Sequence, residues 1–272
     1  PRGGALLASS TPDALWSAPS LRLLRPAALS CSEITRGRLL DRCSMTVPAG
    51  TRLLLVAEPE ESGSTLLRVL AGLTRPDRGR VEIAGLDASA GESRARRVAY
   101  LGPAPGIRNW MTPREALALA ADLLELAPGE AARQAALVIE WARIPADQLD
   151  RPMSRGGPPL IQRTGLAAAL LGDPEVVLLD EPLRAIEAAE RTRLLRLPGR
   201  RRTVILASRY PASEAGLVTH LALLRGGRIA LIARIAELEA AGLPLSSRGI
   251  GALAELRAAA AAGGPGRTPD RS

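Results

Sequence analysis

The sequence has no lysine, no phenylalanine and a single asparagine, Asn109. Arginine, alanine, glycine and proline are abundant instead, so a general compositional bias is the simplest explanation of the missing lysine. Aromatic residues make up only 2% of the chain, and a core must therefore be filled by Leu, Val, Ile and Ala. Apolar residues reach 46%, which excludes a disordered chain and indicates a folded domain of mixed architecture.

Cysteine and histidine are nearly absent. Cys31 and Cys43 are the only cysteines and form neither a CxxC pair nor a disulfide framework, which is typical of a reducing compartment. Cys43 lies in a half-apolar segment, so we expect it to pack in the core. His220 is the only histidine, which excludes a metal site built from several histidines.

Long hydrophobic runs are also missing. No apolar run approaches the ~20 residues that a membrane-spanning helix needs. Residues 1–20 are rich in Pro, Ser and Gly and have an apolar stretch too short for a signal peptide, so we expect a flexible lead. These features predict a soluble protein or one that a partner holds at a membrane.

The net charge is +8, from 36 basic and 28 acidic residues. A basic surface attracts nucleic acid or anionic lipid headgroups. The arginines are spread along the chain, and no aromatic residues are interleaved with them to stack on bases. We therefore expect a solvated basic face and no nucleic-acid partner.

Stretches typical of strands and of helices alternate along the chain. Leucines at helical spacing predict a helix over 65–73, another helix is predicted over 160–171, and the chain is predicted to be helical again from Glu237 before a low-complexity tail. Short apolar runs bounded by turns predict strands at 21–24, 44–47, 52–56, 81–85, 97–101, 176–180, 203–208 and 221–232.

The middle of the chain, residues 112–143, is predicted to be a helical insertion. Thr112 precedes Pro113, and Glu115 stands three residues after Thr112, which is the pattern of a capping box at the start of a helix. Two amphipathic segments, EALALAADLLEL and EAARQAALVIEWARI, are separated by an Ala-Pro-Gly turn. Strands and helices alternating around such an insertion indicate an α/β sheet with a helical subdomain.

The segment GDPEVVLLDEP carries the strongest chemical signal. Its continuous apolar run is typical of a strand buried on both faces of a parallel sheet, and it ends in Asp180 and Glu181. Ligands bind at the carboxyl edge of such sheets. There, in P-loop NTPases, an aspartate holds Mg²⁺ and a following carboxylate can orient an attacking water. The alternative is that the two acids only end a strand and begin a turn before Pro182.

A second segment, RLLLVAEPEESGSTLLRVLAGL, reads as strand, loop and helix. A phosphate-binding loop needs glycines that expose backbone N–H groups, a lysine for the terminal phosphates and a Ser or Thr for Mg²⁺. Here Gly63 stands before Ser64, where the motif has lysine, and Ser62 stands where it has glycine.

Several segments together resemble the nucleotide-binding domain of ABC transporters. They are STLLRVLAGLTRPDRGRVEIAG, ALLGDPEVVLLDEP and LLRGGRIA, in this order and spacing. The resemblance covers about residues 21–238. It implies an α/β fold, a P-loop NTPase core of ABC-transporter type with an antiparallel β subdomain and a helical subdomain at about 103–165. Residues 1–20 precede this domain, and a C-terminal helix and low-complexity tail occupy 239–272.

The same resemblance implies cofactors and partners. Members of the family bind ATP and Mg²⁺, pair with a second nucleotide-binding domain as homodimers or heterodimers, and drive an integral membrane permease. Such a subunit is expected at the cytoplasmic face of the membrane, peripheral through its permease.

The family's nucleotide-site residues map onto this chain only in part. The phosphate-loop frame falls on 57–65, and of its motif residues Ser64 and Thr65 remain. The resemblance implies Glu181 as the catalytic residue and Ser64 with Asp180 as the metal ligands. Its candidate nucleotide-binding residues are Ser62, Gly63, Ser64 and Thr65.

Other family motifs are degenerate. The glutamine expected after the strand RVAYL is replaced by Gly102-Pro103-Ala104, and the histidine that senses the γ-phosphate is replaced by Arg209. The signature reads MSRGGPPLIQR, which assigns its degenerate positions to Ser154, Arg155, Gly156 and Gly157. The Leu-Asp expected after Walker B reads Arg184-Ala185-Ile186-Glu187, no aromatic lies near Ile34 to stack on adenine, and His220 is interpreted as structural.

The acidic loop predicts weak or no ATP binding. Glu58, Glu60 and Glu61 lie in a segment meant to surround polyphosphate. A carboxylate ~4 Å from a phosphate charge costs about 1 kcal/mol in water and several times more near a protein surface. A helix N-terminus returns only roughly 0.3–1 kcal/mol per charge. A rescuing arginine would be Arg68 or Arg209, of which we expect Arg68 to point away because its helix must pack.

Three functions remain open from the sequence. The first is an ABC-transporter subunit with impaired ATP binding and hydrolysis. The second is an active ABC transport ATPase whose loop tolerates these changes. The third is a non-enzymatic interaction module on the same scaffold, whose arginine-rich surface binds acidic lipid or an acidic protein.

Overall fold

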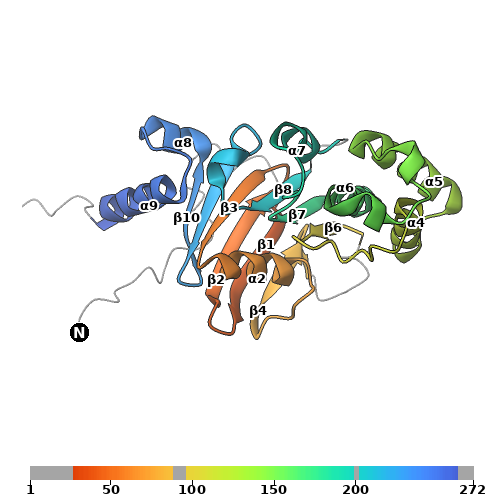
Figure 1. The fold of residues 1–272 in the computed structure, drawn as a ribbon. Coiled ribbons are helices and arrows are strands. Elements are labelled where there is room, and N and C mark those ends of the chain that lie inside the picture. Colours follow the sequence, from red (N-terminus) through yellow and green to blue (C-terminus); the bar gives the residue numbers. More distant parts are fainter. Residues whose placement is uncertain (1–26, 88–95, 199–201, 263–272) are drawn as a thin grey trace, which may run out of the picture.

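The computed structural model describes residues 27–87, 96–198 and 202–262 (Figure 1). The predicted lead at 1–20, the strand at 21–24 and the end of the predicted tail lie outside these residues. Strands and helices alternate in the described part, which is an α/β structure with two sheets and a helical region, as predicted. None of the described helices is both long and apolar enough to cross a membrane.

The larger sheet has six strands in the order β10-β9-β3-β8-β7-β6. Strand β3 pairs in parallel with β8 and β9, and β7 pairs in parallel with β8 and β6, while β10 runs antiparallel to β9 at the edge. Its strands are β3 (Arg52–Glu58), β6 (Val98–Leu101), β7 (Val176–Asp180), β8 (Thr203–Ala207), β9 (His220–Arg225) and β10 (Arg228–Arg234).

A smaller antiparallel sheet has the order β2-β1-β4-β5. It consists of β1 (Ala27–Arg36), β2 (Leu40–Pro48), β4 (Arg78–Ile83) and β5 (Leu86–Asp87). Cys31 and Cys43 are free and buried in this sheet, where they pack in the core as Cys43 was expected to.

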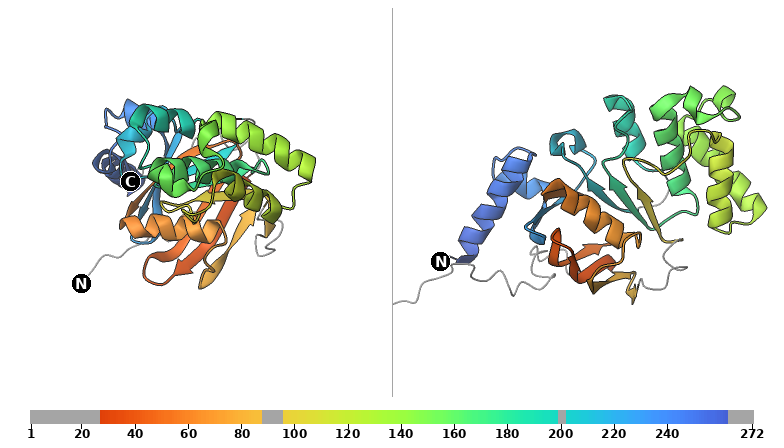
Figure 2. Two further views of the ribbon diagram at one scale, coloured as in Figure 1. Left: turned by 45° about the vertical axis from the view of Figure 1, so that its right-hand side comes forward. Right: turned by 60° about the horizontal axis from the view of Figure 1, so that its bottom comes forward.

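Helix α2 (Glu60–Leu70) lies between the two sheets (Figure 2). Leu66 and Leu67 of the helix share one hydrophobic cluster with residues of both sheets. Leu53 and Leu55 of β3 face this cluster, whereas Leu54 and Val56 face a second cluster formed with the helical region. Because successive strand residues point to opposite faces, an uninterrupted apolar strand supplies both cores.

Helix α2 differs from the predicted span of 65–73. It begins five residues earlier, after Pro59, because acidic residues in the first turn suit the positive end of a helix. It ends at Leu70 because Gly72 adopts a left-handed conformation with φ of 78° that closes the helix.

The helical region consists of α4 (Pro113–Leu123), α5 (Pro128–Ala142) and α6 (Gly157–Leu170). The predicted capping box is present: the Glu115 amide donates to Thr112 Oγ1 at 3.1 Å, and the Thr112 amide donates to Glu115 Oε2 at 2.9 Å. Outside this region lie α7 (Ala188–Leu195), α8 (Ile235–Ala240) and α9 (Ser247–Ala262), with short 3₁₀ turns at Ala146–Gln148, Met153–Arg155 and Pro211–Glu214. Strand β1 and helix α7 were not predicted, because polar residues interrupt the apolar pattern of both.

Candidate functional site

The carboxyl ends of β3, β7 and β8 meet at one edge of the larger sheet, because these strands are parallel. A cavity of about 160 Å³ lies at this edge. It is smaller than the ~300–1,000 Å³ typical of ligand pockets. Its polar lining comes from Glu60, Glu61, Ser64, Asp180, Glu181 and Arg209, together with Ser208 and Ser247.

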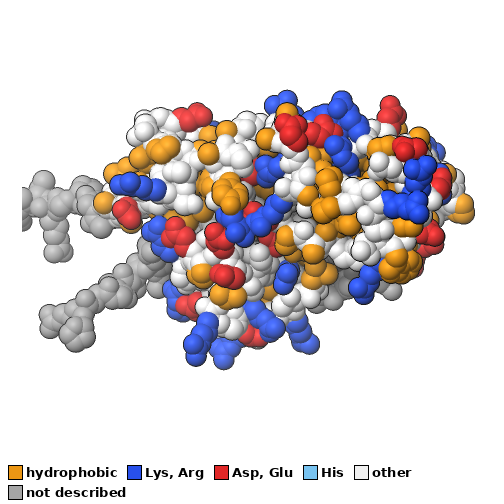
Figure 3. All heavy atoms as spheres, viewed as in Figure 1, with side chains coloured by type: hydrophobic (Ala, Val, Ile, Leu, Met, Phe, Trp, Pro, Cys, Tyr) orange, Lys and Arg blue, Asp and Glu red, His pale blue; other side chains and the backbone are white. Residues whose placement is uncertain are grey.

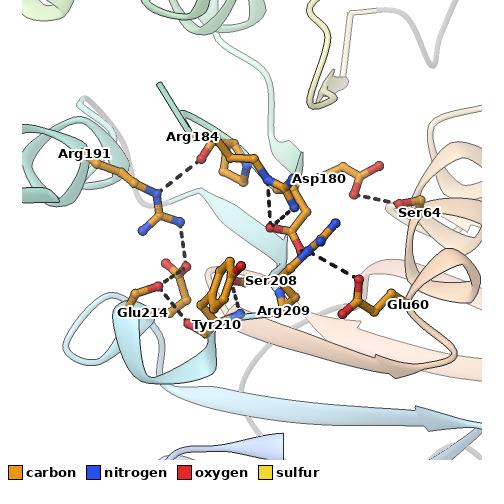
Figure 4. A network of polar contacts seen from close by, with 12 residues as sticks. Glu60, Ser64, Asp180, Arg184, Arg191, Ser208, Arg209, Tyr210 and Glu214 are labelled. Carbon is orange, nitrogen blue, oxygen red and sulfur yellow. Dashed lines mark hydrogen bonds and ion pairs between the residues drawn. The ribbon is translucent and has the colours of Figure 1, made fainter. Parts of the chain in front are cut away.

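Ser64 and Asp180, the predicted metal ligands, are in direct contact (Figure 4). The Ser64 hydroxyl donates to Asp180 Oδ1 at 2.9 Å, and Asp180 is only 1% exposed. Magnesium is commonly held by one or two protein oxygens together with waters and phosphates, so this pair fits a Mg²⁺ ion. Among the described residues there is no cluster of three or more His, Cys, Asp or Glu that would make a fuller metal cage.

Tyr100 of β6 is a site residue that the sequence did not reveal. Its hydroxyl donates to Asp180 Oδ2 at 2.9 Å, so that hydroxyl groups contact both oxygens of this buried carboxylate. Burial is the main cause that raises the pKa of Tyr100 above its usual value. A Cβ atom built on Gly102 would lie 2.9 Å from the Tyr100 hydroxyl. Tyr100 therefore fills space beside the position where the family has its glutamine.

Arg68 was expected to point away from the site. It is exposed and is not among the residues that line the cavity. The Tyr100 side chain, with a smaller contribution from Asp180, raises the pKa of Arg68 above its usual value. The helix still packs, because Leu66, Leu67 and Leu70 supply the buried face and leave Arg68 free to follow the line of Ser64 one turn earlier.

Glu181 is held between two arginines, Arg184 and Arg209, both of which are labelled in Figure 4. Its Oε1 accepts from the Arg209 amide at 2.7 Å and lies 3.4 Å from Arg209 Nε, and its Oε2 lies 2.8 Å from Arg184 Nη2. The backbone of Glu181 is left-handed, with φ of 48°, and its side chain is 16% exposed. Both oxygens of the predicted catalytic carboxylate are thus engaged by guanidinium groups.

The segment after Glu181 is held in place by Arg191 of α7. Arg191 of α7 donates through Nε to the Pro182 carbonyl at 3.3 Å and through Nη2 to the buried Glu214 at 2.6 Å. These bonds join α7 to the 3₁₀ turn that follows Arg209 and Tyr210, as Figure 4 shows.

The predicted phosphate loop is largely helical. Because α2 begins at Glu60, the first free N–H groups belong to two glutamates. Ser62 is buried and its hydroxyl donates to the Pro59 carbonyl at 2.6 Å, and the Thr65 hydroxyl donates to the Glu61 carbonyl at 2.8 Å. Of the four candidate nucleotide-binding residues, Gly63 and Ser64 line the cavity, and Ser62 and Thr65 are outside its lining.

Two of the three loop carboxylates face the cavity, rather than all three. Glu60 and Glu61 line it, and Glu60 lies 3.3 Å from Arg209 Nε. Glu58 is the last residue of β3 and pairs with Arg225 of β9 at 2.7 Å, because the two are register partners in the sheet. Arg209 is therefore shared between Glu60 and Glu181.

The signature candidates lie on the helical region and are outside the lining of this cavity. Ser154 and Arg155 are in the 3₁₀ turn before α6, Gly156 follows, and Gly157 opens α6 with φ of 67°. The Ser154 amide donates to the Asn109 carbonyl at 2.8 Å, which fixes the turn against the loop before α4. Prolines in the first turn of α6 remove N–H groups that could otherwise contact an anion.

His220 begins β9 at the opposite edge of the sheet from the cavity. It is 9% exposed, and its Nδ1 lies 2.8 Å from the Thr219 hydroxyl. Burial, with a contribution from Arg234, lowers the pKa of His220 to about 4, so the ring is neutral at pH 7. This placement agrees with the structural interpretation of His220.

Comparison with known proteins identifies relatives over most of the chain. The family model described as ABC transporter matches residues 40–184. The aliphatic sulfonates import ATP-binding protein SsuB 1 of Mesorhizobium japonicum is 32% identical over 198 residues, covering 71% of this chain and 72% of that protein. The taurine import ATP-binding protein TauB of the same organism is 34% identical over 183 residues, covering 66% of each chain.

Solved structures share the fold. The structure titled as the ATP-binding subunit of an ABC transporter has a TM-score of 0.68 at 21% identity, covering 78% of this chain and 92% of its own. A dimeric ATP-binding cassette bound to ADP and Pi also has a TM-score of 0.68, at 15% identity, covering 76% of this chain and 98% of its own.

Proposed function

The chain belongs to the ABC transporter family, and we propose that it is the ATP-binding subunit of an importer. The relatives named for sulfonate and taurine are both import ATP-binding proteins, which supports this direction of transport. We propose that an integral membrane permease holds the subunit at the cytoplasmic face of the membrane. The subunit would pair there with a second nucleotide-binding domain, as a homodimer or a heterodimer.

We further propose that ATP binding and hydrolysis are impaired in this subunit. The observation that carries this proposal is the start of α2 at Glu60, which puts two carboxylates where phosphate oxygens would meet backbone N–H groups. Repulsion of about 1 kcal/mol or more per carboxylate exceeds the roughly 0.3–1 kcal/mol that the helix end returns.

Gly63, which stands where the motif has lysine, supports the same proposal. A Cβ atom on Gly63 would lie 3.0 Å from the Ala57 Cβ, closer than the packing readily accepts. The strand and the helix are therefore packed for a glycine at this position. Arg209 lines the cavity, but its guanidinium is already shared by Glu60 and Glu181.

The remaining metal ligands fit Mg²⁺, which in this family neutralises charge on the phosphates during transfer. Ser64 and Asp180 would hold the ion, and Tyr100 would orient Asp180 through its second oxygen. Glu181 would orient a water only after its carboxylate is released from Arg184 and Arg209.

An active ATPase is the second candidate, and the intact contact between Ser64 and Asp180 favours it. Isothermal titration of the purified chain with Mg-ATP, followed by a phosphate-release assay, separates the two. Impaired function predicts no heat of binding at millimolar ATP and no turnover. Tight binding with turnover that disappears in Glu181→Gln would establish the active enzyme instead. Association with membranes or acidic proteins that is independent of nucleotide would favour the non-enzymatic module.

A further inference from the structure

Six arginines project from one end of the antiparallel sheet. We call this group the arginine tip, and its members are Arg36, Arg38, Arg42, Arg75, Arg78 and Arg80. All six are exposed, and Figure 3 shows basic side chains projecting from this lower end of the molecule. The tip combines the turn between β1 and β2 with the segment that leads from α2 into β4.

Asp77 holds these two segments together. Its Oδ1 accepts from Arg36 Nη1 at 2.7 Å, and its Oδ2 accepts from the Gly37 amide at 2.8 Å. The Asp77 amide donates to the Thr35 carbonyl at 2.8 Å, and Thr35 is the register partner of Arg78. The turn residue Arg38 is thereby brought to the same end of the sheet as Arg75 and Arg78.

The tip has more positive charges than acidic partners. Arg36 pairs with Asp77, Arg80 lies 3.0 Å from Glu82, and Arg42 lies 3.7 Å from Asp41. Arg38, Arg75 and Arg78 form no ion pair with any carboxylate in the part of the chain that the structure describes. Three guanidinium groups are therefore available to an outside anion.

We propose that the arginine tip is an interaction surface for the anionic headgroups of a lipid bilayer. A guanidinium presents a planar fork of donors that matches phosphate oxygens, and clustered arginines near an anionic membrane each add to the attraction. The tip projects from the end of the sheet and is not a pocket, so its arginines can contact the flat surface of a bilayer. Leu73, two residues before Arg75, is 64% exposed and places an apolar side chain beside the charges.

Nucleic acid fits this tip less well than lipid. Stacking of bases needs aromatic side chains among the basic residues, and none stands within residues 35–42 or 73–80. The inference does not depend on ATP binding, because the tip and the edge cavity share no residue.

The test is flotation of the purified full-length chain with vesicles of phosphatidylcholine alone or with phosphatidylglycerol, without nucleotide. We expect binding to the anionic vesicles only, weakening as salt rises from 50 to 500 mM in line with charge screening. Replacing Arg38, Arg75 and Arg78 together by Gln is expected to lower the partition coefficient by about 100-fold.

The control replaces Arg108, Arg196 and Arg248 by Gln, because these are also exposed but lie on other elements. It removes the same net charge and is expected to lower partitioning by less than about threefold. Equal losses in the two triple variants would overturn the proposal, as would unchanged binding of the tip variant. Single-stranded DNA binding as tightly as the vesicles, and lost in the tip variant, would overturn the lipid assignment. These outcomes do not depend on whether the chain binds or hydrolyses ATP, because the flotation is done without nucleotide.

Discussion

The edge cavity has two halves whose carboxylates lie in opposite environments. The metal half is formed around Ser64 and Asp180, and the phosphate half around Glu60 and Glu61. In the metal half, Asp180 is buried and accepts hydrogen bonds from Ser64 and Tyr100. In the phosphate half, Glu60 is exposed, its side chain being 58% accessible, and its ion pair is with Arg209, which is itself 39% exposed. A buried charge is tolerated only with partners, whereas an exposed one needs none. The metal half is thus constrained by the core, whereas the first two positions of α2 in the phosphate half, Glu60 and Glu61, are exposed and are not constrained by it.

Restoring the phosphate half should give the largest effect. The variant Ala57→Gly, Glu60→Gly, Ser62→Gly and Gly63→Lys removes one carboxylate, supplies a cation and gives the lysine Cβ room beside position 57. We expect Mg-ATP affinity to rise by about 100-fold or more, because each close charge pair near a protein surface contributes several kcal/mol. Titration calorimetry measures it. The matched variant that keeps Ala57 should gain less, and no gain in either would mean that the phosphate half is not what limits binding.

Removing the buried carboxylate should cost stability that the exposed one does not. Asp180→Leu leaves two hydroxyl groups without their acceptor, and we expect the free energy of unfolding to fall by about 2 kcal/mol. Glu60→Ala should change it by about 0.5 kcal/mol or less. Urea denaturation of both variants gives the difference. Similar values for the two would break the contrast between the halves.

His220 extends the comparison to a second buried titratable group. Asp180 is accommodated through hydrogen bonds to its carboxylate, whereas His220 is accommodated in its neutral form. Its pKa is lowered to about 4 in the folded chain, against 6.5 for the free side chain. Between these two pH values the unfolded chain therefore binds more protons than the folded chain. The contribution of the neutral His220 to the free energy of unfolding is fully present above pH 6.5 and is lost as the pH falls towards 4. We expect a loss of about 2 kcal/mol between pH 7 and pH 5.

The assignment to His220 is clean because the chain has no other histidine. Urea denaturation at each pH measures the slope, and His220→Leu should flatten it between pH 6.5 and pH 5. A slope that persists in this variant would show that other groups control stability in that range.

The contact between Tyr100 and Gly102 should give the smallest effect. Gly102→Ala places a Cβ atom 2.9 Å from the Tyr100 hydroxyl and should destabilise the chain by about 1 kcal/mol. The same change in a Tyr100→Val background should cost little, since the ring is gone. The coupling between the two changes is read from the four unfolding free energies. A coupling near zero would mean that Tyr100 does not fill this space.

The sequence predicted those parts of the molecule that depend on local pattern. The buried strand ending at Asp180, the Thr112 cap and the alternation of strands and helices were all evident from spacing. The placement of Ser64 beside Asp180 was predicted through family resemblance.

The parts that could not be predicted depend on contacts between distant segments. Tyr100 and Asp180 are 80 residues apart, and no local pattern indicates that they touch. The engagement of Glu181 by Arg209 likewise needs two neighbouring strands to be aligned.

Helix α2 joins two regions that have been described separately. Its first turn forms one wall of the edge cavity, and the segment after its last turn leads into the arginine tip. Eleven helical residues make a rod about 16 Å long, which packs between the two sheets. One continuous helix therefore connects the wall of the cavity with the segment that carries Arg75 and Arg78. Helix α2 is thus the shortest path along the chain between the edge cavity, where we propose that nucleotide would bind, and the arginine tip, which we propose contacts the membrane.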